Sequence, residues 1–371
     1  MAEEVDEKAS GDLVSVTKLA PSVPEPEPIK IPDVELIVDG FGFMPKEKSL
    51  SKFEIQSKMK MKKSSKTLKD VKSPESEHSP CASSTNINIV RRYTWKTKNR
   101  MTVQVITYGA TITSIQVPDK KGIPDDVLAG FDTLEEYFQP RNPYFGATIG
   151  RYANFIRDGT MVVKPSGRMY MLSTNRGHHH YNGGYVGFDK HAGPEIMYDH
   201  IFTINADKYT AVDDDGLVTG EKNIVGGTPY DFRVPRVLRA MLPKIPMGGY
   251  DINFCVTQGT EQDLTFQSRV LHPVSGRVLE VYSNQPGMQF YTGNLLPDPD
   301  KIVEGKKSYG YVPLMGKQGT CYKKHGLFCL MPQNYPDAVN HKNFPKSVLN
   351  PGEVYVHKIQ YKFGLLLGKY V

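Results

Sequence analysis

The stretch Phe328-Cys329-Leu330-Met331-Pro332-Gln333-Asn334-Tyr335-Pro336-Asp337-Ala338-Val339-Asn340 begins with four apolar residues and then turns polar. The apolar run is short and is followed at once by a proline, which is typical of a buried β-strand that ends there. Amide and carboxylate side chains gather over the positions after the proline. We therefore predict a strand that ends at the rim of a pocket, where a few polar groups stand beside apolar ones.

Length and composition limit the class of protein that this chain can be. It has 371 residues, of which 39% are hydrophobic, and this is enough for one sizeable core. The acidic N-terminus lacks the basic and then apolar pattern of a signal peptide, and no run approaches the length of a membrane-spanning helix. We therefore expect a soluble, cytoplasmic protein. Without any CxxC spacing, the four cysteines are expected to be free thiols: Cys81, Cys255, Cys321 and Cys329.

Residues 1–87 are predicted to form a disordered arm. The first part is acidic, with prolines at alternate positions near residues 21–28, and such a composition cannot bury a core. Residues 34–43 are an apolar island within this arm. They are either an added strand at a sheet edge, of this chain or of a partner, or a fluctuating cluster in a tail.

The second part of the arm is basic. Lys46–Lys72 contains ten lysines against three acidic residues. We expect this segment either to bind an anionic partner electrostatically or to act as a solubilising tail. Specific nucleic-acid binding is not expected, because the lysines have no arginine or aromatic neighbours to recognise bases. Ser73-Pro74 and Ser79-Pro80 follow, and phosphate at either serine would offset part of the lysine charge.

After residue 88 the chain consists of short apolar or alternating runs separated by Gly, Pro, Asn and Asp, which is typical of all-β proteins. The strand-like runs are residues 103–117 (two strands), 160–163, 201–204, 266–270, 278–282 and 355–363. Only Leu134–Phe138 indicates a short helix. Because there is no βαβ spacing, we predict a large antiparallel β-sandwich over residues 88–371.

From residue 103 to the C-terminus the chain contains several long motifs, at residues 108–112 (YGATI), 143–154 (PYFGATIGRYAN), 183–190 (GGYVGFDK) and 285–294 (QPGMQFYTGN). In sequence and in order, these motifs resemble those of the aldose 1-epimerase (galactose mutarotase) family. The resemblance implies a galactose mutarotase-like sandwich without a cofactor. It also implies the interconversion of the α and β anomers of aldohexoses such as galactose and glucose, by a histidine acid and a glutamate base that work in one pocket.

The resemblance places this chain's residues at the family's functional positions, with several changes. The family's glutamate base corresponds to Met331, which carries no titratable proton. The sugar-binding Asn-Arg pair corresponds to Asn154 and Phe155, so the amide is kept and the guanidinium is lost. A sugar-binding histidine corresponds to Asn182, which hydrogen-bonds but does not titrate near neutral pH. Two positions are unchanged, and they predict a buried carboxylate and an amide that bind sugar hydroxyls: Asp251 and Gln289.

The family's acid histidine has no counterpart that the motifs identify. It lies in an Asn-His-Ser-Tyr-Phe-Asn-Leu block between two motifs that correspond here to Gly187–Lys190 and Ile204–Tyr209. Only residues 191–203 separate them, so the resemblance implies an internal deletion near residues 190–200, or a gene model that skips an exon. His191 and His200 remain as substitutes to consider.

Two other features are weaker. His178-His179-His180 could present two ligands on one face of a strand, but the loop is rich in glycine and has no acidic or cysteine neighbour, so we expect no metal site. Arg151 corresponds to an arginine that the family has besides its sugar-binding one, and a structural ion pair is expected for it.

Three functions remain open from the sequence. The chain is an inactive relative that binds carbohydrate, or an active mutarotase in hexose metabolism, or an interaction scaffold that uses its basic arm. The first is favoured because Met331, Asn182 and Phe155 remove ionisable groups from otherwise matching motifs.

Overall fold

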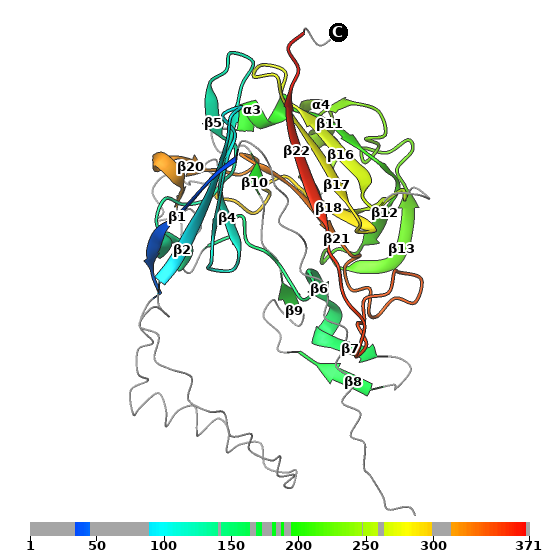
Figure 1. The fold of residues 1–371 in the computed structure, drawn as a ribbon. Helices are drawn as coiled ribbons and strands as arrows, with labels where there is room; N and C mark the ends of the chain where they lie inside the picture. Colours follow the sequence, from blue (N-terminus) through cyan, green and yellow to red (C-terminus); the bar gives the residue numbers. More distant parts are fainter. Residues whose placement is uncertain are drawn as a thin grey trace, which may run out of the picture. The chain divides into compact units, whose positions relative to one another are not determined.

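A computed structural model describes residues 34–44, 89–139, 142–163, 168–172, 180–182, 187–188, 194–246, 248–258, 263–298 and 313–368. Three antiparallel sheets organise these residues (Figure 1). The N-terminal sheet has the order β1 (Val34–Phe43), β2 (Ile89–Thr97), β3 (Thr102–Ile106), β4 (Thr111–Pro118) and β5 (Pro124–Asp126). The six-stranded sheet has the order β10 (Gly187–Phe188), β21 (Phe328–Gln333), β18 (Gly287–Tyr291), β15 (Asp251–Val256), β12 (Ala206–Val212) and β13 (Val218–Ile224). The C-terminal sheet has the order β14 (Arg236–Val237), β11 (Ile201–Ile204), β16 (Thr265–Leu271), β17 (Arg277–Ser283) and β22 (Ile359–Leu365).

Smaller elements connect the sheets. Two-stranded ribbons are β6 (Asn154–Ile156) with β9 (His180–Asn182), β7 (Thr160–Val163) with β8 (Arg168–Met171), and β19 (Leu314–Met315) with β20 (Cys321–Tyr322). Short helices are α2 (Leu134–Tyr137), α3 (Pro194–Tyr198), α4 (Leu238–Met241), η1 (Arg157–Gly159), η2 (Leu242–Lys244) and η4 (Lys317–Gly319). The sequence predicted α2 and missed α3 and α4, and all three are only about one turn long.

The main core lies between the six-stranded and C-terminal sheets. Alternate residues of the six-stranded sheet point toward it, among them Phe254, Phe290 and Leu330, and they meet Phe202 and Val281 of the C-terminal sheet. This period of two is what the sequence pattern requires of a strand with one buried face. The predicted large antiparallel β-sandwich is confirmed.

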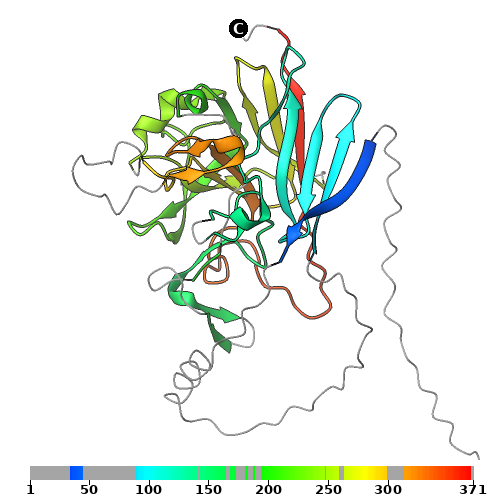
Figure 2. The ribbon, with the colours of Figure 1, turned by 90° about the vertical axis from the view of Figure 1, so that its left-hand side faces the viewer.

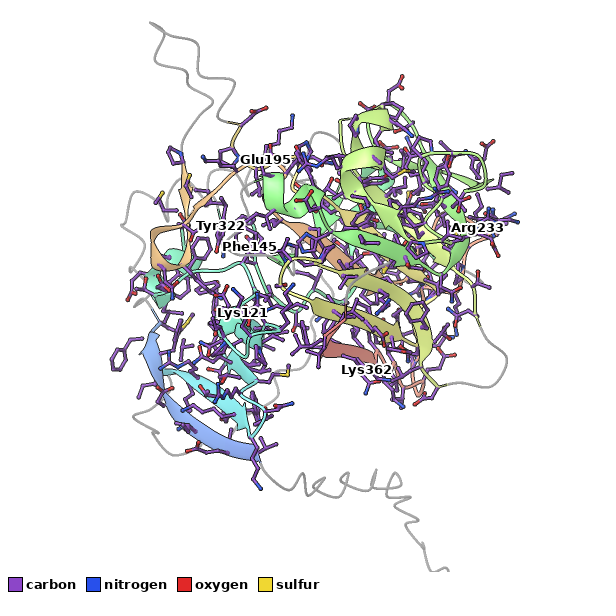
Figure 3. All side chains as sticks on the ribbon, turned by 90° about the horizontal axis from the view of Figure 1, so that it is seen from above. Lys121, Phe145, Glu195, Arg233, Tyr322 and Lys362 are labelled. Atoms are coloured by element: carbon purple, nitrogen blue, oxygen red, sulfur yellow. The ribbon has the colours of Figure 1, made fainter. Side chains whose placement is uncertain are left out.

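A second core lies beside the N-terminal sheet. Phe145 and Tyr322 meet edge to face, with ring centroids 5.2 Å apart (Figure 3). Helix α2 begins here because Glu136 returns to accept a hydrogen bond from the backbone N–H of Thr133, 2.9 Å away. Tyr137 of this helix is buried against Phe131. These contacts pack α2 and the loops around it against the β19–β20 ribbon.

Strand β1 decides between the alternatives left open for residues 34–43. It pairs antiparallel with β2 and forms the outer edge of this chain's own sheet (Figure 2). Phe41 packs on the second core and on a smaller cluster formed by Val90, Ile106 and Leu134, and its ring lies 6.3 Å from that of Tyr137. The predicted arm of residues 1–87 therefore needs correction for residues 34–43. They pair with β2 and so belong to the domain that follows the arm. The remainder of residues 1–87 lies outside the described residues.

The contribution of β1 to stability can be tested with two substitutions in the same strand. Phe41→Ala is expected to lower the free energy of unfolding by about 1–3 kcal/mol, below the full value for a buried phenylalanine because Phe41 is half-buried. Leu36→Ala is the matched control, because Leu36 is 52% exposed, and its effect should stay within about 0.5 kcal/mol. Urea unfolding followed by circular dichroism measures both. Equal effects would mean that β1 does not pack on the cores.

Two predicted strands have different limits in the structure. Residues 355–358 are not part of β22, because the side chain of Asn284 binds the carbonyl of Val356 and the N–H of Lys358 in place of a regular ladder. Strand β21 does not end at Pro332 but continues to Gln333. Proline is tolerated there because β10 pairs only with Phe328 and Cys329, so the edge beside Pro332 has no strand partner among the described residues.

The cysteines agree with the sequence where the structure describes them: Cys255, Cys321 and Cys329 are free. Cys81 lies outside the described residues. Across the described part of the chain, no helix has the length and apolar character needed to cross a membrane.

Candidate functional site

A row of side chains crosses the six-stranded sheet on the face opposite the main core. The register places Asn253 of β15 beside Gln289 of β18, and Gln289 beside Met331 of β21. Their sequence neighbours Phe254, Phe290 and Leu330 point into the core, so these three point to the other face. We call Asn253, Gln289 and Met331 the polar row. It is the place where the sequence predicted a pocket rim.

Gln289 is the best-fixed member of the row. It is 5% exposed, and its Nε2 donates to Asp251 Oδ1 at 2.8 Å. Its Oε1 accepts a hydrogen bond from Gln333 Nε2 at 3.4 Å. Asp251 is exposed rather than buried as predicted, because it is the first residue of β15. The pair therefore presents an accessible carboxylate whose orientation is set by a buried amide, which suits the binding of sugar hydroxyls.

Asn253 is a candidate that the sequence analysis missed. It is 1% exposed, and neither its Oδ1 nor its Nδ2 has a hydrogen-bond partner among the described residues. A Cβ atom on Gly287 would lie 2.5 Å from Asn253 Oδ1, so the glycine gives the amide its room. A buried amide without partners costs about 1–3 kcal/mol, so a bound polar molecule at this point would be stabilising. The alternation Asp251-Ile252-Asn253 was the available signal, because it puts two polar side chains on one face.

Asn154 and Asn182 form a second pair. They face each other in the register of β6 and β9. Asn154 has a positive φ of 72°, and its Oδ1 accepts a hydrogen bond from the N–H of Phe155 at 2.9 Å. Phe155 itself lies 4.8 Å from the ring of Tyr181, measured between centroids. Strand register thus pairs Asn154 with Asn182, and a hydrogen bond pairs Gln289 with Asp251.

Met331 has apolar surroundings. It packs on the second core, where Tyr291 and Cys329 are buried. Burial raises the pKa of the Cys329 thiol well above its usual value, and the charge of Asp251 adds to this effect. A thiol of that kind stays protonated at neutral pH. Neither Met331 nor Cys329 is suited to remove a proton from a sugar hydroxyl.

His200 lies on the wrong side of the sheet to act as a substitute acid. Its ring is 5.4 Å from that of Phe328, which points into the core, whereas Met331 is three residues further along β21 and points to the other face. Its Nδ1 lies 3.1 Å from the carbonyl oxygen of Ile196. Burial lowers the pKa of His200 to about 4, so the ring is neutral near pH 7. His191 lies outside the described residues.

The loop after β21 is held by a buried carboxylate. Asp337 is 5% exposed, accepts a hydrogen bond from Asn340 Nδ2 at 2.7 Å and lies 3.6 Å from His341 Nε2. Burial raises the pKa of Asp337 above its usual value, although these contacts oppose the effect. Asn340 also donates to the carbonyl of Thr160 at 2.9 Å, which ties the loop to β7. Asp337 therefore has a structural role.

Two weaker features of the sequence were Arg151 and the histidine run at residues 178–180. Arg151 is exposed, and the described part of the chain contains no ion pair to it, so the expected structural ion pair is not found. Of the histidine run, His178 and His179 lie outside the described residues. Among the residues that are described, no cluster of three His, Cys, Asp or Glu side chains could hold a metal ion.

Comparison with known proteins gives consistent matches. A family model described as Aldose 1-epimerase matches residues 91–191 and 188–362. Galactose mutarotase of Bos taurus is 35% identical over 334 aligned positions, which cover 72% of this chain and 92% of that protein. Galactose mutarotase of Homo sapiens is 36% identical over 331 positions, which cover 71% and 91%. Among solved structures, the GalM/aldose epimerase homologue from C. elegans has a TM-score of 0.61 at 22% identity, covers 72% of this chain and 97% of that chain, and shares the fold.

The same matches contain positions for which this chain has no residue. The two segments that match the family model overlap at residues 188–191. The bovine alignment spans 334 positions, whereas 72% of 371 residues is about 267, so roughly 67 aligned positions have no residue here.

Proposed function

We propose that this chain, which belongs to the aldose 1-epimerase family, is a cytoplasmic relative that binds a hexose or glycan without interconverting its anomers. The observation that carries the proposal is the position of Met331. It stands beside Gln289 in the polar row, where the family resemblance places the catalytic base. Anomer interconversion needs a base that takes a proton from the C1 hydroxyl and an acid that gives one to the ring oxygen. A thioether can do neither.

The missing acid supports the same proposal. The overlap at residues 188–191 and the roughly 67 unmatched positions of the bovine alignment are what a deletion of the family's acid block would produce. The one histidine near this point that the structure describes, His200, is neutral and on the core face of the sheet. We infer that the deletion removes the acid and that no described residue replaces it.

Binding itself requires only hydrogen-bonding groups in fixed positions, and these remain. Asp251 offers an exposed carboxylate, and the buried amides of Gln289 and Asn253 lie on the same face of the sheet. Asn154, which is opposite Asn182 in the register of β6 and β9, adds a further amide. Because neither group of residues must titrate, such a site accepts sugars with a blocked anomeric carbon as well as free ones. Methyl galactosides are therefore suitable probes beside galactose and glucose.

The polar row can be tested by one substitution. Gln289→Leu keeps the approximate volume of the side chain but removes the hydrogen bond to Asp251, and it should weaken hexose binding by about tenfold or more, since a lost hydrogen bond to a charged group is worth about 1.5–3 kcal/mol. Gln360→Leu is the matched control, because Gln360 is exposed on β22. Calorimetric titration with galactose, glucose and methyl galactoside measures the effect. Equal affinities of the two variants would contradict binding at the polar row.

A scaffold function that uses the basic arm is a second proposal. It rests on the ten lysines of residues 46–72, which lie outside the described residues. Because Phe43 and Ile89 are opposite each other in the β1–β2 register, a short Gly-Ser linker can replace residues 46–86 without removing β1. This variant should lose anionic partners that the full chain captures at low salt. Phosphate at Ser73 or Ser79 should weaken capture too, since each adds roughly −1.5 to −2 charges.

Salt dependence is the measurement for the arm. Capture by the full chain should fall steeply between low and moderate salt, because exposed lysines act as screened point charges. If the linker variant captures every partner of the full chain, the arm is a solubilising tail.

A further inference from the structure

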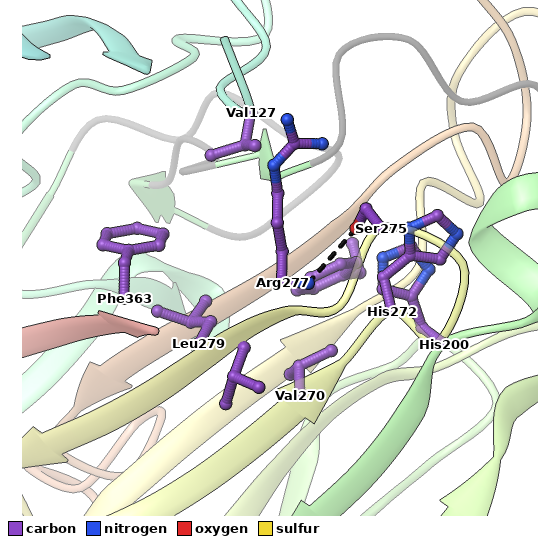
Figure 4. Close-up of a pocket in the computed structure, with 10 residues that line it drawn as sticks. Val127, His200, Val270, His272, Ser275, Arg277, Leu279 and Phe363 are labelled. Atoms are coloured by element: carbon purple, nitrogen blue, oxygen red, sulfur yellow. Dashed lines mark hydrogen bonds between the residues drawn. The ribbon is translucent and has the colours of Figure 1, made fainter. Parts of the chain in front are cut away.

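A cavity of about 70 Å³ lies where the three sheets meet (Figure 4). Its apolar wall is a row across the C-terminal sheet, in which Val270 faces Leu279 and Leu279 faces Phe363. Phe328 of the six-stranded sheet and Val127, which follows β5, complete the wall. Phe328 points to the core face, so this cavity is separate from the polar row and independent of the proposed function.

Polar groups line one side of this cavity. They come from the turn between β16 and β17 and from the residue before β11. His272 Nδ1 lies 2.9 Å from Ser275 Oγ, and the rings of His272 and His200 stack with centroids 4.7 Å apart. His200 is only 6% exposed. Arg277 begins β17 and also lines the cavity.

The guanidinium of Arg277 is held by two backbone carbonyls. Its Nε donates to the carbonyl of Val117 at 3.0 Å and its Nη2 to the carbonyl of Ile123 at 3.2 Å, and both acceptors are neutral. Within the described residues no carboxylate forms an ion pair with Arg277, although Asp119 lies within electrostatic range. The guanidinium has five N–H donors, so its hydrogen bonds to two carbonyls leave other N–H groups available. A guanidinium at the edge of an apolar cavity favours a ligand that has both an anionic group and an apolar part.

We propose that this cavity binds a short-chain monocarboxylate. The alkyl tail lies along the row from Val270 to Phe363, and the carboxylate accepts hydrogen bonds from Arg277. The size limits the tail to a few carbons, because a cavity of ~150 Å³ binds benzene and this one is smaller. Nothing in the family site or the polar row requires such a ligand.

The test is a ligand-observed NMR titration of the full chain with acetate, propionate, butyrate and hexanoate, and with butyramide as the neutral analogue. Affinity should rise about fourfold per added methylene until the cavity is full, as expected for about 0.8 kcal/mol per buried CH₂. Butyramide should bind at least tenfold more weakly than butyrate. No binding by any carboxylate, or equal affinities for butyrate and butyramide, would overturn the proposal.

Two variants assign the site. Val270→Ile fills part of the cavity and should weaken butyrate binding several-fold, whereas Val281→Ile, further along the sandwich core and outside the cavity, is the matched control. Arg277→Gln should abolish the preference for butyrate over butyramide. Unchanged butyrate affinity in folded Val270→Ile would place any binding elsewhere, and a preserved preference in Arg277→Gln would remove the proposed role of the guanidinium.

Discussion

Purified protein is expected to leave the interconversion of galactose and glucose anomers at its uncatalysed rate. Loss of one proton carrier typically lowers a rate by about 10²–10⁴-fold. We propose that both carriers are missing here, because Met331 stands where the family resemblance places the base and the buried His200 is neutral on the core face of the sheet. Polarimetry of freshly dissolved α-galactose and α-glucose measures the rate directly. Turnover comparable with that of a galactose mutarotase assayed in parallel would show that the chain is an active enzyme.

Restoring the base alone is expected to be insufficient. Met331→Glu places a carboxylate beside Gln289, but His200 remains neutral on the core face of the sheet. The variant should therefore stay at the uncatalysed rate, as should Met331→Gln, which matches it in shape but carries no charge. Measurable epimerisation by Met331→Glu and not by Met331→Gln would reveal an acid in this site. In that event the proposal that the site has no acid is wrong.

The sandwich and the polar row could be predicted largely from the sequence, because both follow from the alternation of side chains along strands. Leu330 and Met331 are neighbours that must point to opposite faces, and the structure places Leu330 in the core and Met331 beside Gln289. The family resemblance added which residues stand at the functional positions. Neither pattern depends on contacts between distant parts of the chain.

What could not be predicted depends on such contacts. The side chain of Asn253 has no hydrogen-bond partner among the described residues, and it has room to lie buried because residue 287, 34 positions away, is a glycine. Phe41 joins the domain through α2, which follows it by 93 residues. Residues 355–358 alternate like a strand, yet Asn284 binds their backbone and interrupts the ladder. Each case depends on a contact between residues that are distant in the sequence, and local patterns do not reveal such contacts.

The largest expected effect on stability comes from a buried ion pair that links the N-terminal sheet to the β19–β20 ribbon. Lys317 Nζ lies 2.9 Å from Asp126 Oδ2, and the two side chains are 5% and 9% exposed. Asp126 Oδ1 also accepts the backbone N–H groups of Ile115 and Leu128 at 3.1 and 3.0 Å. Lys317→Met would leave the carboxylate buried without its counter-charge, and removal of one partner from a buried pair typically costs about 3–5 kcal/mol.

Urea unfolding followed by the fluorescence of Trp95, the single tryptophan, measures this loss. Lys324→Met is the matched control, because the ion pair of Lys324 with Asp298 is 3.3 Å long and partly exposed, and such pairs contribute about 0–1 kcal/mol. The double variant Asp126→Asn/Lys317→Met should recover much of the stability, since the amide oxygen still accepts the backbone N–H groups and no charge is left unpaired. If Lys317→Met is no more damaging than Lys324→Met, the charge of Asp126 is reached by water and the pair does not hold the ribbon to the sheet.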